Sequence, residues 1–214
     1  MTHLQLDHLF CFVEADTALA DLGLTETYRR SHPGQGTANV CYCFDNAYLE
    51  LLWVTDADEL SRSALGRSHM HRRARWRETG ASPFGIAVRR GPFIPWTTWD
   101  YRPPYLPELA LPVSICGDDP QQPFLFVSPG QERPDQWSPD RAGDLQQPAG
   151  LKEILDLELR VPALVQPHSD VLASESAGLL RVTNTNEEAQ QLVLTLSHRD
   201  GDRRRLLLPD FKWI

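Results

Sequence analysis

The fold is decided by two short stretches near the N-terminus, Leu6-Asp7-His8-Leu9-Phe10-Cys11-Phe12-Val13 and Tyr48-Leu49-Glu50-Leu51-Leu52-Trp53-Val54. Both are rich in aromatic and branched residues, which is typical of β-strands. Alternate side chains of a strand share a face, so His8 lies on an apolar face with Leu6, Phe10 and Phe12. By the same rule, Glu50 lies on a face with Tyr48, Leu52 and Val54. Each stretch therefore places a polar side chain among residues of the core.

His8 and Glu50 are for this reason the first candidate site. A buried carboxylate is costly unless it is paired or bound to a cation. If the two strands are neighbours, the imidazole and the carboxylate form a pair of the kind that binds a divalent metal. The alternative is a buried ion pair or hydrogen-bonded pair without a metal.

Composition sets limits on the class of protein. The chain has 214 residues, of which 41% are hydrophobic, and a net charge of -8. This length is ample for a hydrophobic core, and the acidic balance argues against nucleic acid as a partner. No apolar run is long enough to span a bilayer, and the N-terminus lacks a signal pattern, so we expect no membrane partner. The four cysteines form no Cys-x-x-Cys motif, which favours reduced thiols and a cytoplasmic location.

Turn and helix signals divide the chain into three parts that we expect to form one compact α+β domain. Residues 1–56 have the order strand, helix, strand, strand, strand. Residues 151–214 repeat that order, with strands expected at 154–161, 179–183, 192–197 and 205–208. Residues 57–150 connect the two with a helix over 58–78, strands over 83–89, 111–115 and 124–128, and a proline- and aromatic-rich stretch. The arginine-rich run 67–77 is expected to be a solvated helix face.

A second candidate site is the stretch His32-Pro33-Gly34-Gln35-Gly36-Thr37-Ala38-Asn39. Glycines such as Gly36 let backbone N–H groups approach a ligand, and three further side chains supply hydrogen bonds, namely His32, Thr37 and Asn39. The alternative is a tight connecting loop. Trp96 and Trp99 are candidates for an apolar pocket wall, or for a flap packed on the core.

These stretches together resemble the glyoxalase-like domains of the vicinal oxygen chelate superfamily, which shares the glyoxalase, bleomycin resistance and extradiol dioxygenase fold. The resemblance is carried by residues 6–9, 32–39 and 44–51. It implies paired βαβββ modules whose curled mixed β-sheets surround a small-molecule cleft. It also implies that the first and fourth strands lie side by side, and that His8 and Glu50 occupy the positions of metal ligands.

The resemblance implies an enzyme of the lyase, isomerase or dioxygenase kind that acts on a small organic substrate. A divalent metal (Zn, Fe, Mn or Ni) on His8 and Glu50 would chelate two neighbouring oxygens, or Glu50 would act as a general base. The substrate would be bound by the remaining candidates, which are His32, Gly36, Thr37, Asn39, Trp96 and Trp99. In the C-terminal copy, Asp156 stands at the place of His8 and an apolar residue near Leu207 at that of Glu50, so the sequence supplies no clear third or fourth ligand. His32 is a candidate substitute, because its glycine-rich loop could fold over the pocket.

Two other readings of the same resemblance stay open. The first is a metal-free module that binds or sequesters a small metabolite without catalysis. The second is a degenerate relative whose role is to contact a protein partner. The superfamily completes its pockets within one chain or across a homodimer, and the sequence does not decide between these arrangements.

Overall fold

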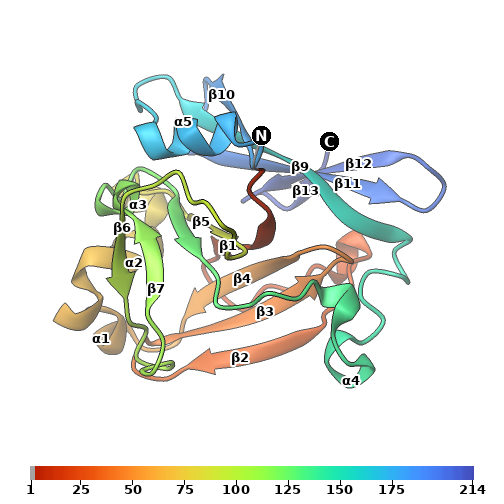
Figure 1. Cartoon of the computed structure of the whole chain (residues 1–214), viewed down its shortest axis with the longest axis horizontal. Coiled ribbons are helices and arrows are strands. Elements are labelled where there is room, and N and C mark those ends of the chain that lie inside the picture. The colour runs from red at the N-terminus through yellow and green to blue at the C-terminus, as the bar shows by residue number, and fades with distance from the viewer. Residues whose placement is uncertain (1–2) are drawn as a thin grey trace.

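The computed structural model describes residues 3–214, with the backbone alone at residues 63 and 64. Two β-sheets pack against each other across a shared hydrophobic core (Figure 1). The larger sheet has eight strands: β1 (Leu6–Phe12), β2 (Tyr28–His32), β3 (Thr37–Cys43), β4 (Tyr48–Val54), β5 (Phe84–Val88), β6 (Thr98–Tyr101), β7 (Leu111–Ser114) and β8 (Phe124–Val127). The smaller sheet has five: β9 (Leu151–Pro162), β10 (Arg181–Thr185), β11 (Gln191–His198), β12 (Arg203–Leu208) and β13 (Lys212–Trp213). The α+β class expected from the sequence is confirmed.

Strand β1 lies at the centre of the larger sheet. β1 pairs in parallel with β4 and antiparallel with β5, so the two stretches that carry His8 and Glu50 lie side by side. The full strand order is β2-β3-β4-β1-β5-β8-β7-β6. β1 pairs in parallel with β4, and β5 pairs in parallel with β8. The strand set whose pairing matches β1–β4 is therefore β5–β8, in the middle of the chain.

The C-terminal segment has the expected order of elements but a different pairing. β9 pairs in parallel with β10 and antiparallel with β11, and it does not pair with β12. The helix α5 (Ser169–Ser176) connects β9 to β10, and a helical crossover joins strands that run in the same direction. The expectation that this segment repeats the N-terminal pairing is wrong, and Asp156 and Leu207 are not equivalent to His8 and Glu50.

Helices are short and few. The helix expected before Gly23 is a single 3-10 turn (Ala20–Leu22), and Gly23 ends it in the left-handed conformation. Residues 58–78 form several short segments, which are α1 (Ala57–Leu60), a 3-10 helix (Ser63–Ser68), α2 (Met70–Arg73) and α3 (Trp76–Thr79). Short 3-10 helices over Ile115–Asp118 and Pro134–Gln136 and the helix α4 (Pro139–Ala142) complete the set. Within residues 3–214, no helix has the length and apolar character needed to cross a membrane.

The arginine-rich run is only partly solvated. Arg67, Arg75 and Arg77 form surface ion pairs, as a solvated face predicts. Arg73 is fully buried instead, and its guanidinium donates hydrogen bonds to five backbone carbonyls, those of Ser68, Gly117, Pro120, Gln122 and Ser82. A guanidinium has five N–H donors, so this single side chain ties the helical segment to the segments that precede β5 and β8.

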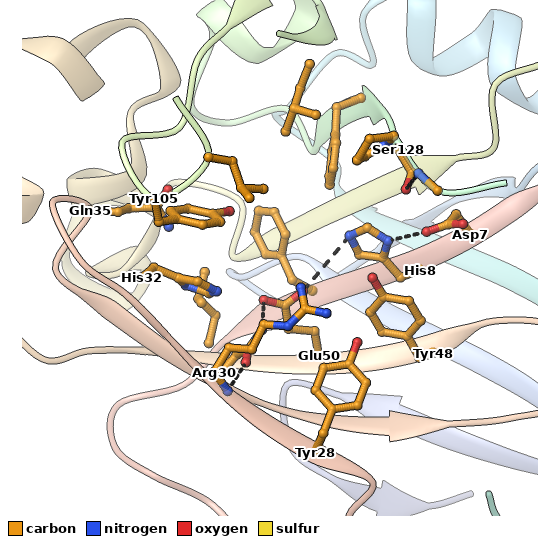
Figure 2. A pocket seen from close by; sticks show the side chains of 18 of the residues that line it. Asp7, His8, Tyr28, Arg30, His32, Gln35, Tyr48, Glu50, Tyr105 and Ser128 are labelled. Atoms are coloured by element: carbon orange, nitrogen blue, oxygen red, sulfur yellow. Dashed lines mark hydrogen bonds and ion pairs between the residues drawn. The ribbon is translucent and has the colours of Figure 1, made fainter. Parts of the chain in front are cut away.

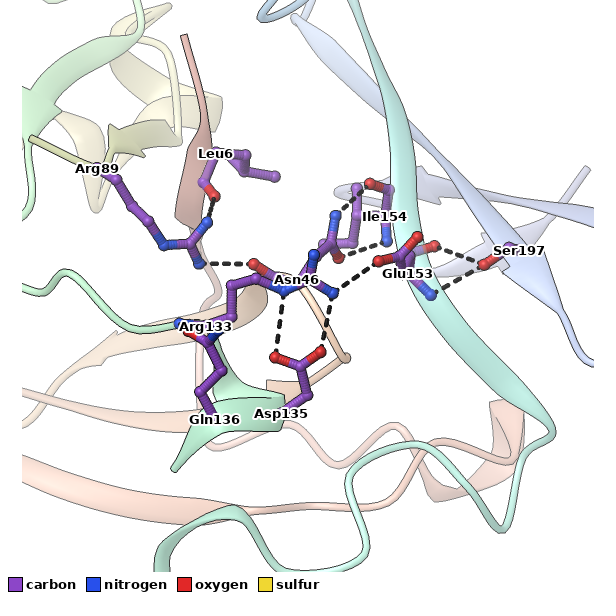
Figure 3. A network of polar contacts seen from close by, with 9 residues as sticks. All are labelled: Leu6, Asn46, Arg89, Arg133, Asp135, Gln136, Glu153, Ile154 and Ser197. Carbon is purple, nitrogen blue, oxygen red and sulfur yellow. Dashed lines mark hydrogen bonds and ion pairs between the residues drawn. The ribbon is translucent and has the colours of Figure 1, made fainter. Parts of the chain in front are cut away.

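The turn between β3 and β4 joins the two sheets (Figure 3). The Asn46 side chain donates a hydrogen bond to the Ile154 carbonyl at 2.8 Å and accepts one from the Ile154 N–H at 2.9 Å. Arg89 donates to the backbone carbonyls of Asn46 and Leu6, at 2.6 and 2.7 Å. These contacts fix the start of β1 and the turn before β4 against strand β9.

Candidate functional site

A cavity of about 400 Å³ lies on the face of the larger sheet that points away from the smaller one. The two ends of this sheet approach each other across the cavity. Tyr101 of β6 donates a hydrogen bond to Gln35 at 2.7 Å, and Tyr105 stacks on His32 with ring centroids 4.3 Å apart. Ligand sites are usually concave, largely apolar and of this size. The curl of the sheet therefore creates a cavity that is suited to a small organic molecule.

His8 points into the cavity from β1 and is held by its neighbour in the chain (Figure 2). The His8 Nδ1–H donates a hydrogen bond of 2.7 Å to the Asp7 carboxylate. Neighbouring residues of a regular strand point to opposite faces, but the pairing of β1 with β5 shifts register between Leu6 and His8. Such a bulge redirects side chains, so both residues reach the same cavity. The imidazole also stacks on Tyr48, with centroids 4.5 Å apart.

Glu50 faces His8 from the neighbouring strand β4. Its Oε2 lies 4.0 Å from the His8 Nε2, and its Oε1 accepts a hydrogen bond of 2.5 Å from the Asn39 side chain on β3. Asn39 is held in turn by the backbone N–H of Arg30, which donates to its Oδ1 at 3.0 Å. Strands β2, β3 and β4 are consecutive neighbours in the sheet, so their pairing builds this chain of contacts. The distance between His8 and Glu50 leaves both atoms open to a ligand.

Burial and charge set the protonation states around this pair. Burial raises the pKa of the Asp7 carboxyl, but the hydrogen bond and charge of His8, with Ser128 and Arg89, hold that pKa below its ordinary value of 3.8. Asp7 is therefore ionised at neutral pH. Burial lowers the pKa of His32, with the Glu50 charge opposing this, so His32 is neutral. Burial raises the pKa of Tyr28 and Tyr48, which stay phenols with an O–H to donate.

The stretch 32–39 contributes part of what the sequence predicts. His32 and Asn39 line the cavity, and Thr37 lies beside it with its hydroxyl 2.9 Å from the His32 Nδ1. Gly36 does not line the cavity. It has a φ of +70°, and a side chain there would collide with the carbonyl of Asp56. Position 36 therefore needs a glycine because the turn packs closely against the segment after β4.

Neither tryptophan lines the cavity. Trp96 packs in the core between the two sheets, and its indole N–H donates to Ser174 of α5 at 2.9 Å. Trp99 packs beside the cavity wall, with the Arg67 guanidinium 4.5 Å from its ring centroid. Both tryptophans therefore belong to a flap packed on the core, which was the alternative interpretation of this stretch of the sequence. The aromatic side chains that line the cavity are instead Phe10, Tyr28, Tyr48, Tyr101, Tyr105, Phe124, Phe126 and Trp137.

Sequence reasoning missed four charged residues of the cavity, namely Asp7, Arg30, Glu132 and Arg141. Asp7 is hidden by the bulge, because strict alternation places it on the opposite face. The sequence did contain a signal for Arg30. Tyr28, Arg30 and His32 stand at alternate positions of β2, so they share a face, and all three line the cavity. Tyr48 had the same signal two residues before Glu50 on β4.

The residues present do not fit a resident divalent metal. A protein metal site takes at least three protein ligands in its usual form. Apart from residues 1, 2, 63 and 64, no group of three or more His, Cys, Asp or Glu side chains is placed to hold one. The strand positions that continue this face beyond His8 are Ala87 of β5 and Phe126 of β8, which have no donor atoms. The β3 partner of Glu50 is Cys41, whose thiol keeps its proton because burial raises its pKa. Asp7 is already used by the His8 Nδ1.

Comparison with known proteins gives one family. Residues 6–91 match the model of a family described as a glyoxalase-like domain, and this span covers β1–β5. The resemblance recognised in the sequence is thereby confirmed over that span. No curated protein matches the chain.

Proposed function

We propose, from the glyoxalase-like domain over residues 6–91, that this protein binds a small organic molecule in the cavity and moves a proton on it with His8. The observation that carries this proposal is that the His8 Nε2 and the Glu50 Oε2 lie 4.0 Å apart, too far for a direct hydrogen bond. Both atoms are hydrogen-bond acceptors, so a ligand hydroxyl, which has one hydrogen, donates to only one of them. The two side chains are thus spaced so that Glu50 accepts a hydrogen bond from a ligand hydroxyl while the His8 Nε2 faces a neighbouring C–H.

His8 is the group that we assign as general base. The ionised Asp7 accepts the Nδ1–H, and this hydrogen bond selects the tautomer whose Nε2 carries a lone pair toward the cavity. Asp7 also stabilises the imidazolium that forms when Nε2 takes a proton, which is the role of a carboxylate behind a catalytic histidine. Arg89 positions Asp7, with its Nε 3.5 Å from the Asp7 carboxylate.

Glu50 is the second acceptor of the site. Because Asn39 holds one carboxylate oxygen, the other is fixed beside the His8 Nε2 and accepts a hydrogen bond from a ligand hydroxyl. We therefore expect the ligand to be a hydroxy-carbonyl compound. Its hydroxyl donates a hydrogen bond to Glu50, and His8 takes a proton from the carbon beside its carbonyl. The reaction class is then proton abstraction beside a carbonyl, as in isomerases and lyases. No step in this scheme is routed through a metal.

The second candidate function is binding without turnover. It is favoured by the side chains that enclose the cavity, most of which are aromatic or aliphatic. Such a wall stabilises a bound ligand by burial and needs no chemistry. The two functions differ in whether His8 is needed for more than affinity.

The test is a panel of small hydroxy ketones, keto acids and aldehydes incubated with the protein in D₂O. We expect at least one compound to raise the melting temperature and to gain deuterium beside its carbonyl, as read by mass spectrometry. His8→Asn should abolish the exchange, whereas His71→Asn, a histidine outside the cavity, should keep it. A compound that raises the melting temperature and gains no deuterium supports binding without turnover. A panel in which no compound does either contradicts both functions.

The sequence leaves open whether the cavity is completed within one chain or across a homodimer. Light scattering on the purified protein decides between the two arrangements.

A further inference from the structure

We infer that the ligand of this cavity is a carboxylic acid with an apolar body, and that Arg30 binds its carboxylate. This inference rests on the proposed function only in that the cavity must accept a small organic molecule. It adds the chemical class of that molecule and the residue that selects it.

The first observation is a guanidinium without an anionic partner. Arg30 lines the cavity, yet its guanidinium makes no hydrogen bond or ion pair with any residue in the part of the chain that the structure describes. The guanidinium carbon lies 5.0 Å from the centroid of the Tyr28 ring, and the Glu50 charge acts on it without forming an ion pair. The neighbouring Arg29 differs, because its guanidinium pairs with Glu26 and with Asp16 at 2.6 Å. On the same strand, the arginine outside the cavity is neutralised and the one inside is not.

The second observation is the set of donors around Arg30. The hydroxyls of Tyr28 and Tyr48 turn toward the same part of the cavity as the Arg30 guanidinium (Figure 2). Both phenols keep their protons, since burial raises their pKa. A guanidinium flanked by two O–H donors matches the acceptors of a carboxylate, which arginine binds with two parallel hydrogen bonds.

The third observation fixes which end of the ligand is acidic. Glu50 and the ionised Asp7 stand beside His8, and their carboxylates repel an anion that Arg30 attracts. Part of the wall is apolar, with side chains from α2, β7, β8 and the segment after β6, namely Met70, Leu106, Leu111, Phe124 and Phe126. The carboxylate therefore belongs at Arg30, the reacting carbon near His8, and the apolar body against this wall.

The test compares a matched acid and amide, 3-phenylpropionate and 3-phenylpropanamide, by calorimetric titration. The two have the same apolar body and differ in the charge that Arg30 would bind. We expect wild-type protein to bind the acid at least about tenfold more tightly, the factor of a charge-assisted hydrogen bond. Arg30→Gln should remove this preference, and the control Arg29→Gln should keep it. Circular dichroism shows that each variant is folded.

Three results would overturn the inference. They are equal affinity for acid and amide, a preference that survives Arg30→Gln, and no binding of either compound at millimolar concentration. None of them decides the proposed function, because deuterium exchange on neutral hydroxy ketones measures that separately. Conversely, a preference for the acid that depends on Arg30, in a protein that exchanges no deuterium, would support this inference and contradict the role of His8.

Discussion

The Nδ1 of His8 lies 2.7 Å from a carboxylate oxygen of Asp7, its neighbour in the chain. Two adjacent residues of a regular strand do not meet in this way, and the register shift in β1 makes the contact possible. The consequence is an imidazole with one nitrogen held and the other free toward a cavity. All predictions about activity begin from this arrangement.

Asp7→Asn tests the arrangement through stability. The folded-state pKa of Asp7 is held below 3.8, so the ionised carboxylate stabilises the folded protein above that pH. This stabilisation is lost as the pH falls through the folded-state pKa. We expect the variant to lose about 1–3 kcal/mol of unfolding free energy at about pH 7, and to approach the wild type only as pH falls below 3.8 and through the lower folded-state pKa. Urea unfolding at several pH values measures this. A deficit that does not change with pH would contradict the assignment.

Asn46→Ala tests the junction of the two sheets. The substitution leaves the N–H and the carbonyl of Ile154 without their side-chain partner. We expect it to lower the unfolding free energy by about 1–3 kcal/mol. The matched control is Asn184→Ala on β10, whose side chain is exposed, and which should change stability by less than about 0.5 kcal/mol. Equal effects of the two substitutions would show that the junction contributes nothing.

Arg73→Lys tests the buried guanidinium. Lysine keeps the charge but has three donors on a single atom, so it cannot serve the five carbonyls that Arg73 reaches from three nitrogens. We expect a loss of about 2–4 kcal/mol, compared with less than about 0.5 kcal/mol for Arg75→Lys at the surface. Denaturant unfolding of both variants gives the comparison. A tolerated Arg73→Lys would mean that charge alone is needed there.

Most strands could be predicted from the sequence, because each alternating or continuous apolar run is bounded by turn residues. The stretch 48–54 matches β4 at both ends. The strand β6 was missed, because proline and aromatic residues around it are typical of a loop. The pairing of the middle and C-terminal strands was also beyond the sequence. β5 and β8 are short runs of apolar residues, and nothing in them specifies the neighbour with which each one pairs.

The candidate site could be predicted in its centre and not at its edges. His8 and Glu50 stood out because each breaks an apolar pattern, and the structure brings them together. Asp7 was hidden by a bulge that no pattern of alternation reveals. Trp96 was predicted to line the cavity from its residue type alone, and type does not determine which side of a sheet a connecting segment covers.

The central claim is that His8, acting with Asp7 and Glu50 and without a metal, moves a proton on a bound ligand. Its most direct test is the rate of deuterium incorporation from D₂O into a bound hydroxy-carbonyl compound, measured before and after dialysis against EDTA, with elemental analysis of both samples. We predict exchange that is unchanged by EDTA, reduced at least about tenfold by Glu50→Gln and lost in His8→Asn. Exchange that EDTA abolishes and added Zn²⁺, Fe²⁺, Mn²⁺ or Ni²⁺ restores would contradict the account.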